Sequence, residues 1–363
     1  MKKRSLIPPK DLLKAGFISR NLLISALRLL VSIGLGYGLI HFTLKATGAH
    51  LWNELAKAQS PLLFLALFFY GVILCLTMYR WNLLLRVQGV RLQVWDLIRL
   101  TMIGVFFNLA IPGAVGGDLL KMALVANKAR DKKAEAVLTI MLDRALGLIG
   151  LFIVAGIMMV VYLPFLLDLK QEYRLLQIAA FTVGLGSLGG VFVIILIELR
   201  QTITRYPLIA RIIDYGAGKL PSSVVLTLSR LVNALELYRR NRGTIVCGIA
   251  LSILVHACLA VDLFFVGAGV GEDILGLGNY FLAMPVATAV AAIPVTPAGI
   301  GARDAVIAVF LSAMKARAGK SGVVAVTMTL IIVFWGLIGG VIFCFSKSPK
   351  SKMNMRQATG RNP

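Results

Sequence analysis

Acidic residues and cysteines are scarce in this sequence. The 363 residues include 16 Asp and Glu against 38 Lys and Arg, and only four cysteines. The cysteines stand singly within apolar stretches, without the paired spacing of a zinc site or a disulfide framework, at Cys75, Cys247, Cys258 and Cys344. We therefore expect no disulfide scaffold, no metal site and no cofactor.

Motifs of catalysis are also missing. The sequence has no Walker loop, no Gly-x-Ser-x-Gly, no paired metal-binding carboxylates and no histidine cluster, so we predict neither an enzyme nor ATP-driven transport by this chain alone. Five residues separate His256 from Asp262, whereas membrane acyltransferases place four between the two. We expect His256 to be a hydrogen-bonded core histidine and Asp262 to lie near the outer interface.

Apolar residues dominate what is present. They make up 58% of the chain and the mean hydropathy is +0.86, well above a soluble domain. The formal charge of +22 comes from basic residues that flank the apolar stretches, as expected for cytoplasmic flanks of membrane spans. The pattern indicates a multi-pass protein of a bacterial-type inner membrane and gives no support for nucleic-acid binding.

Eight apolar stretches are each about long enough to enter a bilayer. They cover residues 29–44, 61–79, 100–120, 134–163, 175–199, 244–270, 280–314 and 322–345. The stretch around Pro112 has basic residues on both sides, so both of its ends should face the cytoplasm. We predict that it is a re-entrant hairpin, and that the stretch around Pro297 is a second hairpin from the opposite side.

The predicted fold is therefore an all-α polytopic membrane protein with about six crossings and two re-entrant, broken-helix hairpins in an inverted repeat. The half-repeats span about 61–163 and 244–345 within a membrane domain of residues 1–346. A basic tail, 347–363, follows, and both termini should be cytoplasmic. The inner loop 200–242 has an apolar helical face and many basic residues, which predicts an amphipathic surface helix.

Two Pro/Gly-rich breaks are the strongest functional signal. Superposing Pro112 on Pro297 places Gly116 on Gly301, and charged residues follow each break. Paired breaks in two halves of a chain indicate a transporter's substrate site. A short helix starting near Gly116 or Thr296 would present free N–H groups to an anion. The expected hinge residues are Pro112, Gly113, Gly116, Gly117, Pro294, Thr296, Pro297, Gly299 and Gly301.

Two ionisable residues lie deep in a predicted span. Asp143 and Arg144 are about nine residues from its start, which is roughly 14 Å and close to the middle of a ~30 Å hydrocarbon core. Helix neighbours point about 100° apart, so each needs a partner elsewhere. The candidates are Asp118, Lys121, Arg303 and Asp304. These charges either line a substrate path or only lock a hairpin to a helix.

The same residues resemble one family. The resemblance rests on Phe106-Phe107-Asn108, Pro112-Gly113, Gly116-Gly117-Asp118, Lys121, Asp143-Arg144, Pro294, Thr296-Pro297, Gly299 and Gly301. Together they are similar to the flippase-like transmembrane region of lysylphosphatidylglycerol synthases. The resemblance implies a fold that carries aminoacylated phosphatidylglycerol between leaflets. We expect a stand-alone member without the soluble synthase domain.

The leading prediction is an inner-membrane lipid flippase for an anionic, zwitterionic or aminoacylated headgroup. Its path would be lined by Asn108, Asp118, Lys121, Asp143, Arg144, Arg303 and Asp304. The alternative is a non-transporting subunit that docks a separate transferase through loop 200–242. A membrane-embedded transferase is the weakest reading, because no set of acid, base and nucleophile is visible.

Overall fold

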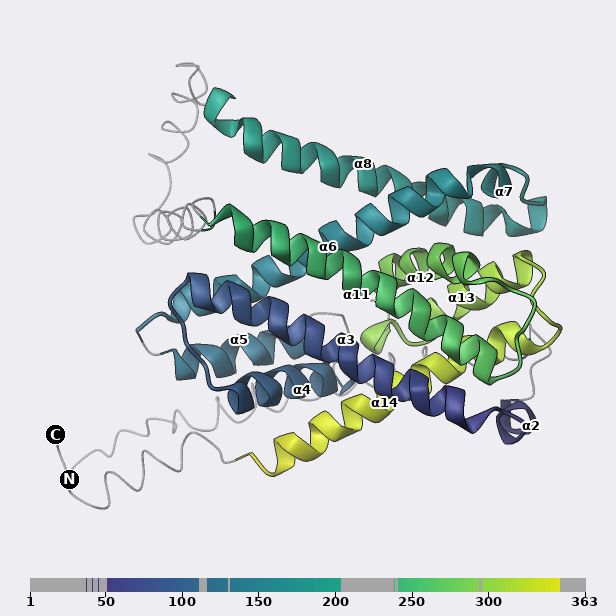
Figure 1. Ribbon diagram of the computed structural model, residues 1–363, viewed down its shortest axis with the longest axis horizontal. Coiled ribbons are helices and arrows are strands. Elements are labelled where there is room, and N and C mark those ends of the chain that lie inside the picture. Colours follow the sequence, from purple (N-terminus) through teal and green to yellow (C-terminus); the bar gives the residue numbers. More distant parts are fainter. Residues whose placement is uncertain are drawn as a thin grey trace, which may run out of the picture.

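Every regular element in the described part of the chain is a helix, which confirms the all-α prediction (Figure 1). The computed structural model describes residues 51–110, 116–129, 131–203, 241–293 and 296–346, together with Tyr37, His41, Lys45 and Tyr238. The predicted first span, most of the basic loop 200–242 and the tail 347–363 lie outside these residues, so they remain predictions.

Four described helices are long and apolar enough to cross a membrane. They are α3 (Ser60–Val87), α6 (Lys133–Val161), α11 (Arg242–Gly269) and α14 (Lys320–Cys344). At 1.5 Å per residue, the 28 residues of α3 extend about 42 Å, more than a ~30 Å hydrocarbon core. Large apolar side chains such as Phe64 and Phe68 are exposed on its outside, as suits a helix facing lipid.

Shorter helices follow the same order in the two halves. Helix α3 is followed by α4 (Val94–Ala110), α5 (Gly116–Lys128) and α6, and α11 is followed by α12 (Leu277–Ala291), α13 (Ala302–Ala313) and α14. The lengths run 28, 17, 13 and 29 residues in the first half and 28, 15, 12 and 25 in the second. Packing is reciprocal, since α4 lies against α14 and α12 against α6.

Helices α3 and α11 run antiparallel through the centre of the molecule. At one end, the Tyr238 hydroxyl, four residues before α11, donates to Leu84 O near the end of α3, at 2.9 Å. At the other, Gln59 N–H, just before α3, donates to Gly269 O, where α11 ends, at 2.7 Å. We call the end at Leu84 the Lys132 end and the end at Gln59 the Glu272 end, after residues in the adjoining loops.

The first pair of short helices begins and ends at the Lys132 end. Lys128, the last residue of α5, forms an ion pair with Asp96 in the first turn of α4. In the adjoining loops, Lys132 Nζ donates to Gln88 O at 2.9 Å. The chain therefore enters α4 and leaves α5 at the same end of the molecule, as Figure 1 also shows.

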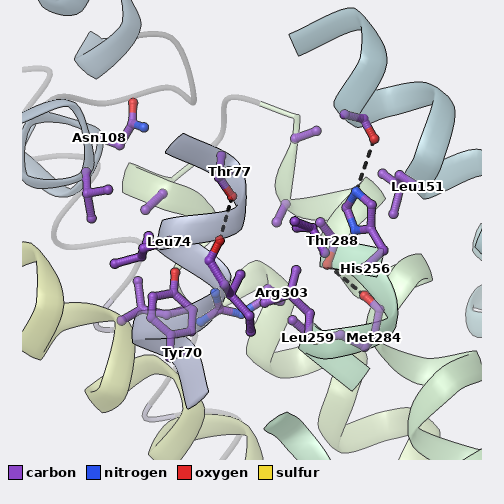
Figure 2. Close-up of a pocket in the computed structure, with 18 of the residues that line it drawn as sticks. Tyr70, Leu74, Thr77, Asn108, Leu151, His256, Leu259, Met284, Thr288 and Arg303 are labelled. Atoms are coloured by element: carbon purple, nitrogen blue, oxygen red, sulfur yellow. Dashed lines mark hydrogen bonds between the residues drawn. The ribbon is translucent and has the colours of Figure 1, made fainter. Parts of the chain in front are cut away.

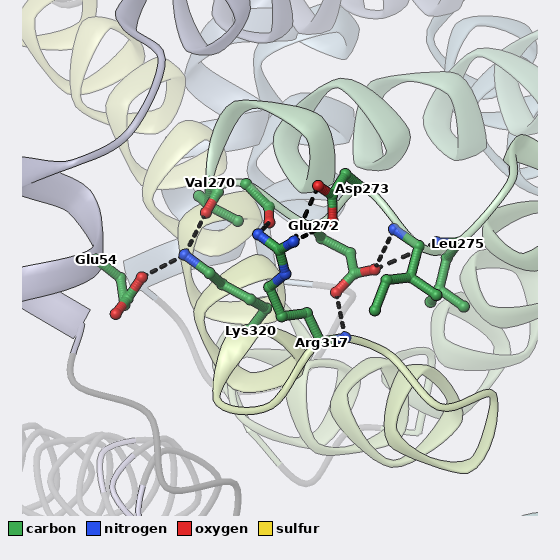
Figure 3. A network of polar contacts seen from close by, with 9 residues as sticks. Glu54, Val270, Glu272, Asp273, Leu275, Arg317 and Lys320 are labelled. Atoms are coloured by element: carbon green, nitrogen blue, oxygen red, sulfur yellow. Dashed lines mark hydrogen bonds and ion pairs between the residues drawn. The ribbon is translucent and has the colours of Figure 1, made fainter.

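The second pair begins and ends at the Glu272 end (Figure 3). Buried Glu272, in the loop before α12, accepts the Arg317 N–H from the loop after α13 at 2.6 Å, and its other oxygen accepts two N–H groups of its own loop. The Arg317 guanidinium pairs with Asp273. Lys320 at the start of α14 pairs with Glu54 of the short helix α2 (Leu51–Ala56).

The remaining described elements connect the halves. Helix α7 (Leu163–Leu167) and the 3-10 turn η1 (Gln171–Tyr173) lead from α6 into α8 (Arg174–Ile203), which packs along α6. The largest apolar core lies among α11, α12, α13 and α14, where Tyr280 and Phe310 are fully buried. A second cluster around Trp81 fills the space near the Lys132 end.

Candidate functional site: an arginine-lined cavity between the helix pairs

A cavity of about 370 Å³ lies between the two halves. That volume is within the usual range for a small-molecule pocket. Helices α3, α4, α6, α11, α12 and α13 all contribute to its walls, and so does the 3-10 turn η2 (Pro297–Gly299). Its polar lining side chains, several of them visible in Figure 2, are Tyr70, Thr77, Arg80, Asn108, Arg144, His256, Thr288 and Arg303.

Three of these lining residues are arginines, whereas no Asp or Glu of the described chain belongs to the lining. Each arginine instead pairs with a carboxylate outside the lining. Arg80 is nearly buried, and its Nε donates to Asp143 Oδ1 and its Nη1 to Ser252 Oγ, both at 2.7 Å. This arrangement joins α3, α6 and α11.

Arg144 is the accessible arginine of the three. Its Nε lies 2.6 Å from Asp118 Oδ2 and its Nη2 lies 2.7 Å from Asp118 Oδ1, which is a two-point contact between α6 and α5. The Arg144 side chain is 55% exposed, whereas the Asp118 side chain is 8% exposed. As expected from helix geometry, Asp143 and Arg144 each find a partner elsewhere. Asp118 was among the predicted partners, but Arg80 was not.

Arg303 is buried at the other side of the cavity. Its Nη2 donates to Asp304 Oδ1 at 3.1 Å and to the Thr329 hydroxyl of α14. Asp304 is fully buried and also accepts the Thr329 hydroxyl, at 2.7 Å to Oδ1. Arg303 Nε is buried without a hydrogen-bond partner in the described chain.

The first break in the helix pairs is capped by a side chain. Asn108 Oδ1 on α4 accepts the Gly117 N–H at the start of α5, at 3.0 Å. A Cβ on Gly117 would lie 2.0 Å from Gly104 O, so only glycine allows this close approach of α4 and α5. Residues 111–115, with the predicted hinges Pro112 and Gly113, lie outside the described residues. Gly116 is buried and is the first residue of α5.

The second break differs from its prediction in one respect. We expected a helix to start near Thr296, but α13 starts at Ala302 and its N-cap residue is Gly301, with φ 82°. Thr296 instead precedes the 3-10 turn η2. Ala298 and Gly299 in that turn have φ values of 51° and 71°, outside the right-handed helical region, so no α-helix runs through them. Pro297 begins that turn, and Pro294 lies outside the described residues.

At each helix start, one backbone N–H group already has a side-chain acceptor. Gly301 N–H donates to Asp304 Oδ2 at 3.0 Å, just as Gly117 N–H donates to Asn108. The expectation of free N–H groups is therefore wrong for these two amides, because local side chains satisfy them. The positively charged groups that line the cavity are guanidinium groups.

Other predicted residues take structural positions. The Lys121 ammonium group lies 3.7 Å from the centre of the Trp81 ring, outside the cavity lining. His256 does line the cavity, and its Nε2 lies 3.1 Å from Gly147 O, which confirms the expected hydrogen-bonded histidine. Asp262 is fully buried, so the expectation that water surrounds it is wrong, whereas its depth in a membrane stays a prediction.

Sequence reasoning missed Arg80. It lies in the second half of α3, six residues before exposed Arg86, and reads as part of a basic cytoplasmic flank. The signal that could have identified Arg80 is its position within the apolar helix, which continues beyond it to Val87. Ser252 and Thr329 were also missed, because a single hydroxyl in an apolar helix rarely identifies its partner.

These features define a class: a helical, multi-pass membrane protein with a polar cavity between two pairs of short helices. The chain belongs to the family described as the lysylphosphatidylglycerol synthase TM region, which matches residues 25–340. This match confirms the resemblance given above.

Two relatives extend the comparison. The chain is 23% identical over 292 residues to a UPF0104 membrane protein of Methanothermobacter thermautotrophicus, covering 78% of this chain and 84% of the relative. It is also 23% identical over 306 residues to a UPF0104 membrane protein of Pyrococcus horikoshii, covering 79% and 87%. Both are named only as membrane proteins, and neither name states an enzymatic activity.

Proposed function

We propose that this chain is a lipid translocator that moves a phosphate-bearing lipid headgroup between leaflets through the arginine-lined cavity. In this proposal α4–α5 and α12–α13 are re-entrant hairpins of an inverted repeat. The Lys132 end faces the cytoplasm of a bacterial-type inner membrane, since basic flanks favour that side. The chain performs no covalent chemistry on its cargo.

One observation carries the proposal: three arginines and no carboxylate line the cavity. A guanidinium group presents up to five N–H donors in a planar fork that matches a phosphate. In Arg80 and Arg303, carboxylates outside the lining hold part of this fork, and Arg303 Nε has no partner in the described chain. A buried donor without a partner costs about 1–3 kcal/mol, which a bound phosphate oxygen would recover.

The apolar part of the lining supports a headgroup that arrives attached to lipid. Leu74, Leu109 and Leu148 line the same cavity as the arginines. Arg144 is both lining and exposed, so it is placed to meet cargo first. Arg303 is deeply buried and would meet cargo later in its passage.

The test is translocation of headgroup-labelled lipid in liposomes that contain only the purified full chain. Three cargo arms are compared: phosphatidylglycerol, an aminoacylated phosphatidylglycerol and a polyprenyl phosphate. We expect selective translocation in at least one arm, slowed about tenfold or more by Arg144→Ala, because one charge-assisted hydrogen bond contributes about 1.5–3 kcal/mol. Arg86→Ala removes an exposed arginine outside the lining and should leave the rate unchanged.

Equal rates in the wild type, in Arg144→Ala and in an Arg303→Lys variant that remains folded would overturn the site. No translocation in any arm, from protein with a normal thermal transition, would favour the docking subunit. Copurification then becomes the decisive measurement: a soluble transferase that is lost on charge reversal of Arg239 and Arg240 would support docking.

A further inference from the structure

Asp262 is a carboxyl group with no visible structural partner. It lies on α11, it is fully buried, and neither of its oxygens has a hydrogen-bond partner in the described chain. An ionised carboxylate in such a place loses its hydration and gains nothing in return, which costs several kcal/mol or more. In this conformation Asp262 is therefore the neutral acid, holding a proton.

The packing of α3 against α11 places Asp262 opposite a lining residue of the cavity. Two contacts set the antiparallel register: Arg80 bonds Ser252, and Leu63 packs on Gly269. Residues that lie opposite each other in two antiparallel helices have numbers with a constant sum. That sum is 332 for both contacts, and it places Tyr70 opposite Asp262. Tyr70 lines the cavity.

Electrostatics agree with this register. Asp262 and Arg303 both lie close enough to Tyr70 to interact with it electrostatically. On α11, Asp262 also lies one helical turn beyond Leu259, another lining residue. The Asp262 carboxyl group therefore lies beside residues that line the cavity, but it is not itself part of the lining.

Few other titratable groups face Asp262. Cys258 lies one turn earlier on the same helix. On α12, Tyr280 packs its hydroxyl against Gly267. On α6, Asp143 is held by Arg80, ten residues or about 15 Å from Tyr70 along α3. Helix α14 has no ionisable residue between Lys320 and Cys344.

We propose that Asp262 is the proton-binding site that couples lipid translocation to a transmembrane pH gradient, with Tyr70 as the link to the cavity. This rests on the proposed function. In the conformation described, the carboxyl group keeps its proton. When a change of conformation hydrates it, the O–H bond breaks, the proton passes to cavity water, and a carboxylate remains until water on the other side returns a proton.

The experiment imposes a pH gradient of one unit on liposomes that contain the wild-type chain and the cargo found above. One proton coupled to one lipid should produce roughly a tenfold difference in cargo between the leaflets at steady state. Asp262→Asn should abolish this accumulation but keep exchange without a gradient. Asp273→Asn is the matched control, since its carboxylate is 63% exposed outside the helices, and it should accumulate cargo like the wild type.

A second measurement does not depend on cargo. Infrared difference spectra between acidic and alkaline buffer should contain a protonated-carboxyl C=O band that is lost in Asp262→Asn and kept in Asp273→Asn. Translocation that does not respond to the pH gradient, or an unchanged infrared band in Asp262→Asn, overturns the proposed proton site. The proposed translocation of lipid is not affected by either result. Absence of translocation in every arm, with the Asp262 band present, overturns the translocator instead.

Discussion

The two pairs of short helices have the same element order, yet their charges find partners differently. In the first pair, Asp118 on α5 reaches across to Arg144 on α6, whose side chain remains more than half exposed. In the second, Arg303 and Asp304 are adjacent on α13, and both are buried with Thr329 of α14. One hairpin therefore holds an accessible charge pair and the other a sealed one.

The two pairs of short helices have similar backbones, yet their charged residues are suited to different roles. The Arg144 guanidinium is accessible and can bind a cargo anion while it keeps its contact with buried Asp118, so no buried charge is left without a partner. Arg303 and Asp304 cannot separate at low cost, because separation leaves a buried charge without compensation. In the proposed transport cycle, the first pair of short helices would receive cargo beside Arg144, and the second would hold Arg303 in place to meet cargo later.

The largest expected effect is on the backbone contact in the first hairpin. Gly117→Ala would place a methyl group 2.0 Å from Gly104 O and 2.6 Å from Asn108 Oδ1, so α4 and α5 must separate. We expect a loss of about 5 kcal/mol or more, because backbone atoms must move, seen as a lower thermal midpoint in detergent. The matched control is Gly104→Ala, whose Cβ would meet no atom closer than 3.7 Å. Equal midpoints for the two variants would contradict the close packing.

The next effect concerns the sealed pair. Asp304→Asn removes the charge that holds Arg303 and weakens the acceptor of Gly301 N–H and the Thr329 hydroxyl. We expect about 3–5 kcal/mol of destabilisation, because one partner of a buried pair remains charged. The measurement is thermal unfolding of the purified chain.

The accessible pair should respond less. Asp118→Asn breaks the two-point contact with Arg144, whose side chain is more than half exposed, so we expect about 1.5–3 kcal/mol, the range of a hydrogen bond to a charged group. A double-mutant cycle with Arg144→Ala measures the coupling directly. If Asp118→Asn destabilised the chain as much as Asp304→Asn, the distinction between the two hairpins would be wrong.

The smallest expected effect is at the hydroxyl beside Arg80. Ser252→Ala removes one acceptor from the guanidinium group but leaves the bond to Asp143, at 2.7 Å. We expect about 0.5–1.5 kcal/mol of destabilisation. The larger Ser252→Val should cost more, because Gly150 approaches so closely that its Cβ would lie 2.4 Å from Ser252 Cβ. Thermal midpoints of the two variants separate the hydrogen bond from the packing.

Much of the architecture could be predicted because its signals are local in sequence. Apolar length predicted α3, α6, α11 and α14, and the first Pro/Gly break located the end of α4 and the start of α5. The start of α13 was misplaced by several residues, because a Thr-Pro pair starts a 3-10 turn as readily as an α-helix.

The site was predicted only in part. That Asp143 and Arg144 must have separate partners followed from helix geometry alone, whereas the choice of Arg80 for Asp143 did not. Lys121 carries the same charge as the lining arginines, yet it packs on Trp81. No local pattern distinguishes these cases, because each depends on which face of a helix meets which neighbour.

The sequence by itself determined that this is a multi-pass helical membrane protein with two matched breaks and charges at membrane depth, because composition, apolar length and helix periodicity are properties of consecutive residues. Only the tertiary structure decided that three arginines share one cavity, that their carboxylates lie outside its lining, and that Asp262 is buried without a hydrogen-bond partner in the described chain. The physical reason is that helices far apart in sequence approach closely where glycines allow it, as at Gly150 and Gly117, and these contacts set the register of everything around them.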